Sequence, residues 1–422
     1  MHILRRTSIL WAATIALTPC AAAAADPSPP SPPPPPPPLS PEEGAKALRL
    51  PDGFRATLFA GEPDVVQPIA FTFDERGRLW VVECLSYPNW VPVGSKAAQD
   101  RVAIFTDKDN DGRFDEKKVF LADGRNLSGI EVGFGGVWLC SVPELLFVPD
   151  RDGNDAPDGP PEVVLDGWDL RAKHNVFNSL AWGPDGWLYG LNGILSSSLV
   201  GKPGAAAADR VPIDCGVWRY HVGRRRFEAV AHGTTNPWGI DWDDRGRMFI
   251  TNCVIEHLWH VVPGAHFRRM YGEDLDPHVY TLLASGVDHI HWAGGAWQTS
   301  RGGQGAHGAA GGGHAHAGCM VYLGESWPRE LRDSVFLCNI HGSRVNRDSV
   351  APKGSTVVFR HERDFLQSAD PWFRGLVLKQ GPDDSAFLAD WNDTGECHDY
   401  DEARVDTGRI FKISYGSGAR PP

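Results

Sequence analysis

Short runs of apolar residues, separated by turns rich in Gly, Asp and Pro, follow one another along the chain from about residue 50. The runs are rich in Val, Ile, Phe and Trp, a composition typical of β-strands. No long stretch repeats its apolar positions at the spacing of an amphipathic helix. The pattern therefore predicts an all-β domain.

One five-residue pattern recurs six times in this region. A turn leads into an apolar residue, an aromatic residue, two mostly apolar or small residues and a polar residue, at 79–83, 137–141, 188–192, 248–252, 335–339 and 386–390. Most copies follow another strand-like run, so each unit starts as a hairpin. Units of about 60 residues suit decorated propeller blades. We predict a six-bladed β-propeller over 48–416, with four-stranded blades and a closing strand at 409–414.

The last positions of the six copies form a polar column: Glu83, Ser141, Asn192, Asn252, Asn339 and Asp390. The first two strands of a blade are antiparallel, so the end of the second strand lies beside the start of the first. We therefore expect the polar column at one mouth of the central channel. The alternative is that these residues only cap strands in solvated loops.

The N-terminus has the features of an export signal over 1–25. Arg5 and Arg6 precede an apolar stretch that is too short to span a bilayer, and small residues follow it. Cleavage near Ala25 would leave a Pro-rich linker over 26–47, the propeller and a tail over 417–422, with no transmembrane helix. We expect a periplasmic or extracellular protein. Lipidation at Cys20 is the alternative to simple cleavage.

Charge and cysteine spacing exclude several classes. The net charge is −12, and Lys and Arg are scattered, which argues against a nucleic-acid partner. No Cys-x-x-Cys occurs, which excludes zinc-ribbon, thioredoxin-like and covalent c-type haem sites in this chain.

Histidines are frequent where the repeat places strand ends. The set comprises His257, His260, His314, His316, His341 and His398. Neutral imidazoles gathered with Asp390 and Glu83 would suit copper, iron or zinc. The best candidate ligands are His314, His316, His341 and His398. The Gly-rich run 302–313 could instead be a loop whose histidines are solvated.

A second candidate metal site is the acidic turn formed by Asp107, Asp109, Asp111 and Asp115. Alternating carboxylates followed by Gly112 resemble the start of a calcium loop. Lys118 stands where an EF-hand has its bidentate acid, so this is not an EF-hand. The two interpretations are a Ca²⁺ site and an acidic hairpin turn.

Four stretches resemble one protein family: GPDGWLYG at 183–190, GGGHAH at 311–316, NIHGSRVN at 339–346 and DWNDTGECHD at 390–399. Together they resemble the propeller of the membrane-bound dehydrogenase family of planctomycete-type multidomain proteins. Members of that family commonly continue into helical repeats and a c-type cytochrome. The resemblance implies a dehydrogenase-like propeller with a separate electron acceptor, such as a cytochrome c.

The fold also resembles, more remotely, soluble quinoprotein glucose and sorbosone dehydrogenases. Those propellers bind pyrroloquinoline quinone over the channel. The resemblance implies that His174 takes a sugar hydroxyl proton and that Arg374, Asn236 and Asp390 bind the cofactor. Thr235 stands where that pattern has an arginine before Asn-Pro.

These observations predict an exported, dehydrogenase-like propeller that binds, and could oxidise, a sugar or polyol at the channel mouth. Its cofactor would be a quinone or a metal. The rival hypothesis is a non-catalytic propeller that binds carbohydrate or protein with the same mouth.

Overall fold

The computed structural model of the chain describes residues 36–395 and 403–416. Residues from Pro37 onward form one compact unit. The predicted signal segment with Cys20, most of the linker, His398 and the tail lie outside the described residues. Among the described helices, none is long and apolar enough to cross a membrane.

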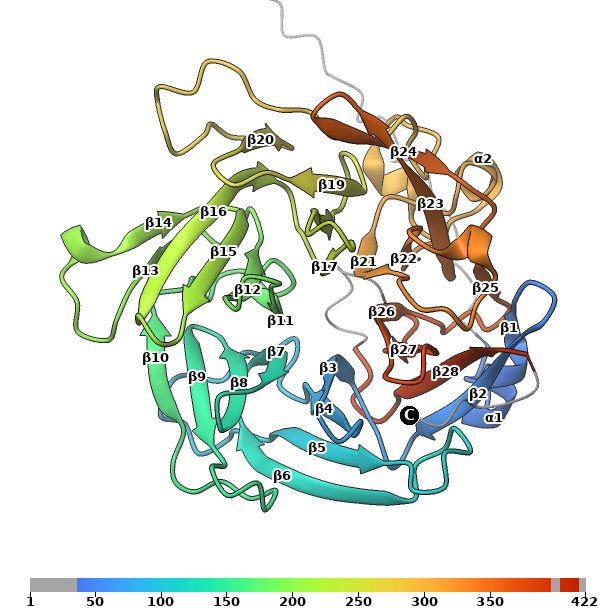
Figure 1. Ribbon diagram of the computed structural model, residues 1–422, viewed down its shortest axis with the longest axis horizontal. Helices are drawn as coiled ribbons and strands as arrows, with labels where there is room; N and C mark the ends of the chain where they lie inside the picture. Colours follow the sequence, from blue (N-terminus) through green and yellow to red (C-terminus); the bar gives the residue numbers. More distant parts are fainter. Residues whose placement is uncertain (1–35, 396–402, 417–422) are drawn as a thin grey trace, which may run out of the picture. The chain divides into compact units, whose positions relative to one another are not determined.

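Six inner strands form a closed ring in this unit (Figure 1). Each strand contacts the next one along the chain, and the last contacts the first. The strands are β3 (Pro68–Phe73), β7 (Leu127–Val132), β11 (Asn178–Trp182), β17 (Ile240–Trp242), β21 (His316–Val321) and β26 (Gly375–Gln380). The ring confirms the predicted six-bladed β-propeller.

The second strand of every blade pairs antiparallel with the inner strand. These strands are β4 (Leu79–Glu83), β8 (Gly136–Ser141), β12 (Leu188–Asn192), β18 (Met248–Thr251), β22 (Val335–Asn339) and β27 (Ala386–Asp390). Their aromatic residues are all buried: Trp80, Trp138, Tyr189, Phe249, Phe336 and Phe387. Apolar clusters form between neighbouring blades, as where Phe249 packs with Leu337 and Val321. The repeating aromatic position is therefore the propeller core.

The outer strands depart from the expected four per blade. The first blade has β5 (Asp100–Thr106) and β6 (Glu116–Gly124), and the second has β9 (Glu144–Pro149) and β10 (Glu162–Asp166). The third has β15 (Gly216–His221), β16 (Arg226–Thr234) and β20 (His266–Arg269), and the fourth has β19 (Leu258–Val261). The fifth has β23 (Arg344–Lys353), β24 (Thr356–His361), β25 (Leu366–Ser368) and β1 (Leu48–Arg49). The third blade has five strands, the fourth three and the fifth six. The prediction of four strands was wrong for the third and fourth blades because β20 joins β16 of the third blade in parallel and leaves the fourth without its outer strand. It was wrong for the fifth blade because both β24 and β25 pair with β23, and β1 pairs with β25.

Insertions decorate the third, fourth and fifth blades. A long loop, residues 270–315, connects β20 to β21 and is called the bridging loop below. The small elements are β13 (Ser198–Val200), η1 (Ala207–Asp209), β14 (Val211–Ile213), η2 (Trp297–Ser300), α2 (Gly305–Ala309) and η3 (Arg329–Leu331).

The N-terminal part of the unit closes the ring. Strand β2 (Phe54–Gly61) pairs antiparallel with β28 (Arg409–Tyr415), which confirms the predicted closing strand. Arg409 is fully buried, and its guanidinium lies 3.1 Å from Glu62 Oε1 and 2.9 Å from Asp370 Oδ2. These ion pairs join the N-terminal and C-terminal strands to the loop before the sixth blade.

A short helix, α1 (Pro41–Ala47), occupies the end of the range predicted to be linker. Ser40 and Glu43 form a capping box at its start, and Pro41 stands in its first turn, where proline needs no hydrogen-bond partner. The compact unit thus includes residues that precede Leu48.

Candidate functional site

A cavity of about 280 Å³ lies at the end of the propeller where the inner strands begin. Its walls include residues at the starts of inner strands and residues just after second strands, among them Ile69, Ser128, His316 and Leu376, and Cys84, Ile194, Cys253 and Trp391. Six tyrosine and tryptophan residues are among its lining residues: Tyr87, Trp90, Trp238, Tyr271, Trp297 and Trp391. We call it the mouth cavity.

The mouth cavity brings together most of the residues that the sequence predicted for cofactor and proton transfer. His174, Asn236, Arg374, His314 and His316 all line it. Their roles stay predictions, but their convergence follows from the blade repeat, which places the loops before inner strands at one end. Asp390 and His341 are not among the described lining residues.

His174 is half-buried and lies in the loop before β11. The side-chain amide of Asn236 donates to the backbone carbonyl of His174 at 3.1 Å. Asn252 Oδ1 in turn accepts from the backbone N–H groups of Thr235 and Asn236, both at 2.9 Å. Asn252, the residue after β18, therefore positions the loop of Thr235 and Asn236, and Asn236 in turn positions the backbone of His174.

The guanidinium of Arg374 donates hydrogen bonds to backbone carbonyls. It donates to the carbonyls of Pro371 and Phe373 at 2.9 and 2.8 Å and to those of Thr394 and Gly395 at 3.1 Å. The side chain is nearly buried, at 9% exposure. These contacts tie the loop after β27 to the loop before β26.

Asp390 contacts the backbone of the same two loops. Its Oδ1 accepts from the backbone N–H groups of Arg374 at 2.7 Å and Asn392 at 2.9 Å. Burial raises the pKa of Asp390 to about 6. Its observed contacts are those of a strand cap, although the sequence predicted a cofactor contact.

The whole polar column is buried and makes contacts of this kind. Glu83 Oε1 accepts from the backbone N–H of Val66 at 2.9 Å, and Ser141 donates to the carbonyl of Arg125 at 2.7 Å. None of the six column residues is among the described residues that line the mouth cavity. The six residues lie at the expected end of the propeller, where second strands end and inner strands begin. Their side chains bond to N–H and C=O groups of the loops instead of forming a polar ring around the mouth.

The predicted histidine cluster divides into separate groups. His314 Nδ1 lies 2.5 Å from Ser300 Oγ, and His314 Nε2 lies 3.3 Å from His341 Nε2. His316 Nε2 lies 2.9 Å from His291 Nδ1, and His260 lies beside Thr356 on the outer part of the fourth blade. His398 lies outside the described residues.

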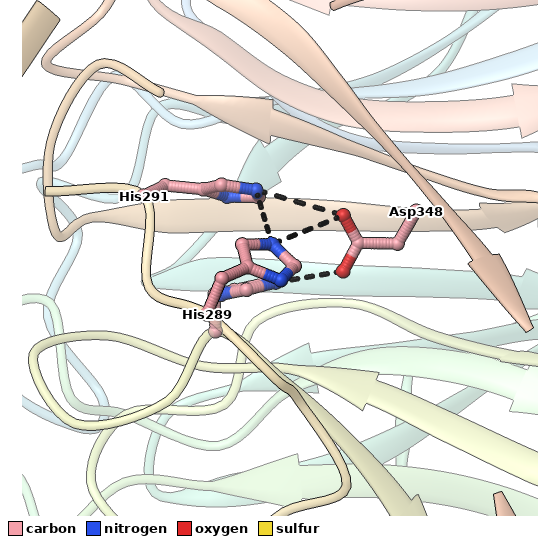
Figure 2. Close-up of side chains that lie close together, drawn as sticks. His289, His291 and Asp348 are labelled. Atoms are coloured by element: carbon pink, nitrogen blue, oxygen red, sulfur yellow. Dashed lines mark hydrogen bonds and ion pairs between the residues drawn. The ribbon is translucent and has the colours of Figure 1, made fainter. Parts of the chain in front are cut away.

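A histidine and aspartate cluster that could hold a metal ion lies behind the cavity wall. It consists of His257, His289, His291 and Asp348, whose ligand atoms all lie within 4.8 Å of one another. Figure 2 shows the imidazoles of His289 and His291 turned toward the carboxylate of Asp348. His291 Nδ1 lies 2.9 Å from His316 Nε2, so one imidazole contact joins this cluster to the mouth cavity.

Sequence reasoning found only His257 of this cluster. The signal that could have found it is the His-x-His pair in Asp288-His289-Ile290-His291. That pair lies in the bridging loop, outside the blade repeat. Asp348 lies in β23, one of the strands that the repeat did not define.

Burial governs the protonation of this cluster. It lowers the pKa of His291 to about 3 and that of His316 well below its ordinary value. Burial by itself would raise the pKa of Asp348, but the charge and hydrogen bonds of the surrounding histidines hold it well below its usual range. Burial alone would lower the pKa of His289, but hydrogen bonds and charge from Asp348 and Asp288 raise it. The site thus combines an anionic carboxylate with imidazoles, which are ligand types that transition metals bind.

The acidic turn predicted to bind calcium connects β5 to β6. Asp107, Asp109 and Asp115 place carboxylate oxygens within 4.8 Å of one another. Asp107 also accepts from the backbone N–H groups of Asp111 and Gly112, and Asp115 accepts from that of Lys108. Asp111 is not part of the group that could hold a metal. Both interpretations of this turn therefore stay open.

Comparison with known proteins identifies the family and the fold. One protein family, described as a domain of unknown function (DUF7133), matches residues 40–416. No curated protein matches the chain. An oxidoreductase from Thermus thermophilus, described as a glucose dehydrogenase, matches 86% of this chain and 100% of its own at 15% identity, with a TM-score of 0.52. The aldose sugar dehydrogenase of Streptomyces coelicolor in its PQQ-bound form matches 87% and 99% at 15% identity, also with a TM-score of 0.52.

Proposed function

The chain belongs to the DUF7133 family, and we propose that it is an exported, dehydrogenase-like propeller that binds a sugar or polyol in the mouth cavity. One observation carries the proposal: aromatic rings and imidazoles line the same cavity. The export signal predicted over 1–25 supports a place outside the cytoplasm, in the periplasm or beyond the cell.

The chemistry of the cavity suits a carbohydrate. Aromatic rings stack against the apolar C–H faces of a sugar, and imidazoles exchange hydrogen bonds with hydroxyl groups. Tyr87 packs edge-on against Trp391 at 5.6 Å and against Trp90 at 6.0 Å between ring centroids, so these three rings form one wall. Trp297 and His314, at 5.3 Å, belong to another part of the lining. A volume of about 280 Å³ is near the lower limit of small-molecule sites, about 300–1,000 Å³, and favours a ligand of monosaccharide size.

Oxidation of a bound hydroxyl group would remove one proton and one hydride. His174 is the candidate proton acceptor because it lines the cavity and an unperturbed imidazole titrates near neutral pH. The hydride needs an acceptor, for which the sequence predicts a quinone or a metal, with a separate protein such as a cytochrome c as the next carrier.

The described residues do not fit pyrroloquinoline quinone. That quinone carries three carboxylates, so its site needs cations. The cations among the described lining residues are Lys173 and Arg374, and the N–H groups of Arg374 already donate to four carbonyls. Thr235 replaces the arginine of the quinoprotein pattern.

This disagreement favours a second candidate function, a non-catalytic propeller that binds carbohydrate with the same cavity. The two functions share the ligand and differ in electron transfer. A dye-reduction assay separates them. The purified chain is supplied with a panel of sugars and polyols, and with either the quinone plus Ca²⁺ or with Cu²⁺. Reduction of the dye supports the dehydrogenase, whereas binding without reduction supports the binding module.

Carbohydrate binding itself is tested by calorimetric titration with the same panel. Trp297→Ala removes a ring that lines the cavity, and Trp292→Ala is the matched control because Trp292 lies in the same loop and is not among the described lining residues. Loss of one stacking contact, about 0.5–1.5 kcal/mol, should weaken binding roughly 2- to 13-fold. Equal effects of both variants, or no binding of any ligand by the wild type, would contradict the proposal.

A further inference from the structure

The cluster behind the cavity wall joins three separate parts of the chain. His257 immediately precedes β19 in the fourth blade, Asp348 lies in β23 of the fifth blade, and His289 and His291 come from the bridging loop. We propose that these four side chains bind a divalent first-row transition-metal ion, which fastens the bridging loop to the two blades. This inference does not depend on the ligand of the mouth cavity.

The distances already match those of a coordination shell. The Nε2 atoms of His289 and His291 are 3.0 Å apart, and each lies 3.5 Å from Asp348 Oδ1. Tetrahedral ligands at about 2.0–2.1 Å from a metal are about 3.3–3.4 Å from one another. His257 Nε2 approaches the other carboxylate oxygen, Oδ2, at 2.8 Å and completes a set of three imidazoles and one carboxylate.

The hydrogen bonds of His291 direct a nitrogen lone pair into this set. The amide nitrogen of Asn339 has two protons for four neighbouring acceptors, one of which is His316 Nε2 at 3.1 Å. His291 Nδ1 lies 2.9 Å from His316 Nε2, and the tautomer of His291 in which Nδ1 donates this hydrogen bond is the one that can bind a metal through Nε2. A neutral imidazole protonated at Nδ1 has its lone pair on Nε2, which faces His289 and Asp348.

The same reasoning applies to His289. Its Nδ1 lies 2.7 Å from the carboxylate of Asp288 and donates to it, so Nε2 is the nitrogen that faces the set. The two Nε2 atoms thus converge with Asp348 Oδ1, which is buried without a hydrogen-bond partner among the described residues. A cation among these atoms would pair with that carboxylate oxygen. Asp288 and His316 then act as the outer partners that orient ligand imidazoles in metal sites.

The ligand types and burial define the class of ion. Imidazole and carboxylate together suit Zn²⁺, Fe²⁺ or Cu²⁺, whereas Ca²⁺ and Mg²⁺ prefer oxygen ligands alone. His257, His291 and Asp348 are at most 2% exposed, so solvent has little access. Four protein ligands with no open position are typical of a structural site. The ion would hold the loop that carries Trp297 and His314 to the mouth cavity.

Metal content and titration of the full chain test the proposal. The purified protein should contain close to one divalent transition-metal ion per chain by elemental analysis. After chelation it should bind one equivalent of Co²⁺, with the visible absorption bands of tetrahedral cobalt, and Zn²⁺ should displace the Co²⁺ and raise the melting temperature. The double variant His289→Ala/His291→Ala should lose at least the roughly 10–100-fold in affinity that even outer-sphere partners contribute.

The control is His266→Ala, because His266 pairs with Asp274 at 2.8 Å in a histidine and aspartate contact outside the cluster. It should bind Co²⁺ like the wild type. If the double variant does not fold, the cobalt spectrum of the wild type decides the question. The proposal is overturned if folded, chelated wild type binds none of Co²⁺, Zn²⁺, Fe²⁺ and Cu²⁺ at micromolar concentration, or if the folded double variant binds Co²⁺ as tightly as the wild type.

Discussion

Replacing Asp390 with Asn should change how the stability of the propeller depends on pH. Asp390 is 1% exposed, and burial raises its pKa from 3.8 to about 6. A group whose pKa is higher in the folded state adds stability below its unfolded pKa and loses it as the pH rises through the folded pKa. The step from 3.8 to about 6, at about 1.4 kcal/mol per pH unit, amounts to about 3 kcal/mol.

Asn at this position keeps the useful contacts and removes the ionisation. Its Oδ1 can accept from the same two backbone N–H groups, those of Arg374 and Asn392. Its amide nitrogen takes the place of Asp390 Oδ2, which accepts from Asn392 Nδ2 at 3.4 Å. The Asn392 amide must therefore turn so that its Oδ1, a buried atom without a hydrogen-bond partner among the described residues, accepts from the new amide. Between pH 4 and pH 7.5 the free energy of unfolding of Asp390→Asn should therefore rise by about 2.4 kcal/mol relative to the wild type, because a small part of the effect has already been lost at pH 4.

Urea unfolding followed by tryptophan fluorescence measures this difference at several pH values in that range. Asp244→Asn, on the surface, is the control for removal of a carboxylate and should follow the wild type throughout. A difference between Asp390→Asn and the wild type that stays constant with pH would refute the reasoning. It would mean that Asp390 does not titrate in this range in the folded protein.

Further predictions concern the acidic turn, the mouth cavity and the closing strand. Ca²⁺ should raise the melting temperature of the wild type but not that of Asp109→Asn/Asp111→Asn, and no response of the wild type would leave the turn as an ordinary hairpin. If the wild type oxidises a sugar, His174→Ala should lower kcat by roughly 10²- to 10⁴-fold in steady-state assays with KM little changed. Arg409→Met leaves Asp370 buried without its cation and should lower the free energy of unfolding in urea by about 3–5 kcal/mol.

The blade count and the closing strand could be predicted because they depend on local, repeating chemistry. Each second strand needs an aromatic residue between blades and a polar residue at its end, and all six copies retain both. The same regularity places His174, Asn236 and Arg374 at one end of the ring. Strand numbers were harder to predict, because only tertiary pairing shows that β20 joins the third blade.

The blade repeat could not predict the histidine and aspartate cluster because the members of the cluster follow no shared period. His289 and His291 come from the bridging loop, and Asp348 meets them only once the fifth blade has folded. The sequence also could not predict which way the side chains of the polar column point. The side chain of a residue at a strand end can face a cavity or a neighbouring backbone N–H group. In this protein the side chains of Glu83, Asn252 and Asp390 accept hydrogen bonds from backbone N–H groups of loops.

The central claim is that the mouth cavity is the carbohydrate site, and a crystal structure with the tightest-binding sugar of the panel tests it most directly. We predict a sugar ring against the wall of Tyr87 and Trp391, with hydroxyl groups within hydrogen-bond distance of His174 or His314. Sugar density on another face of the propeller, with none in the mouth cavity, would contradict the account.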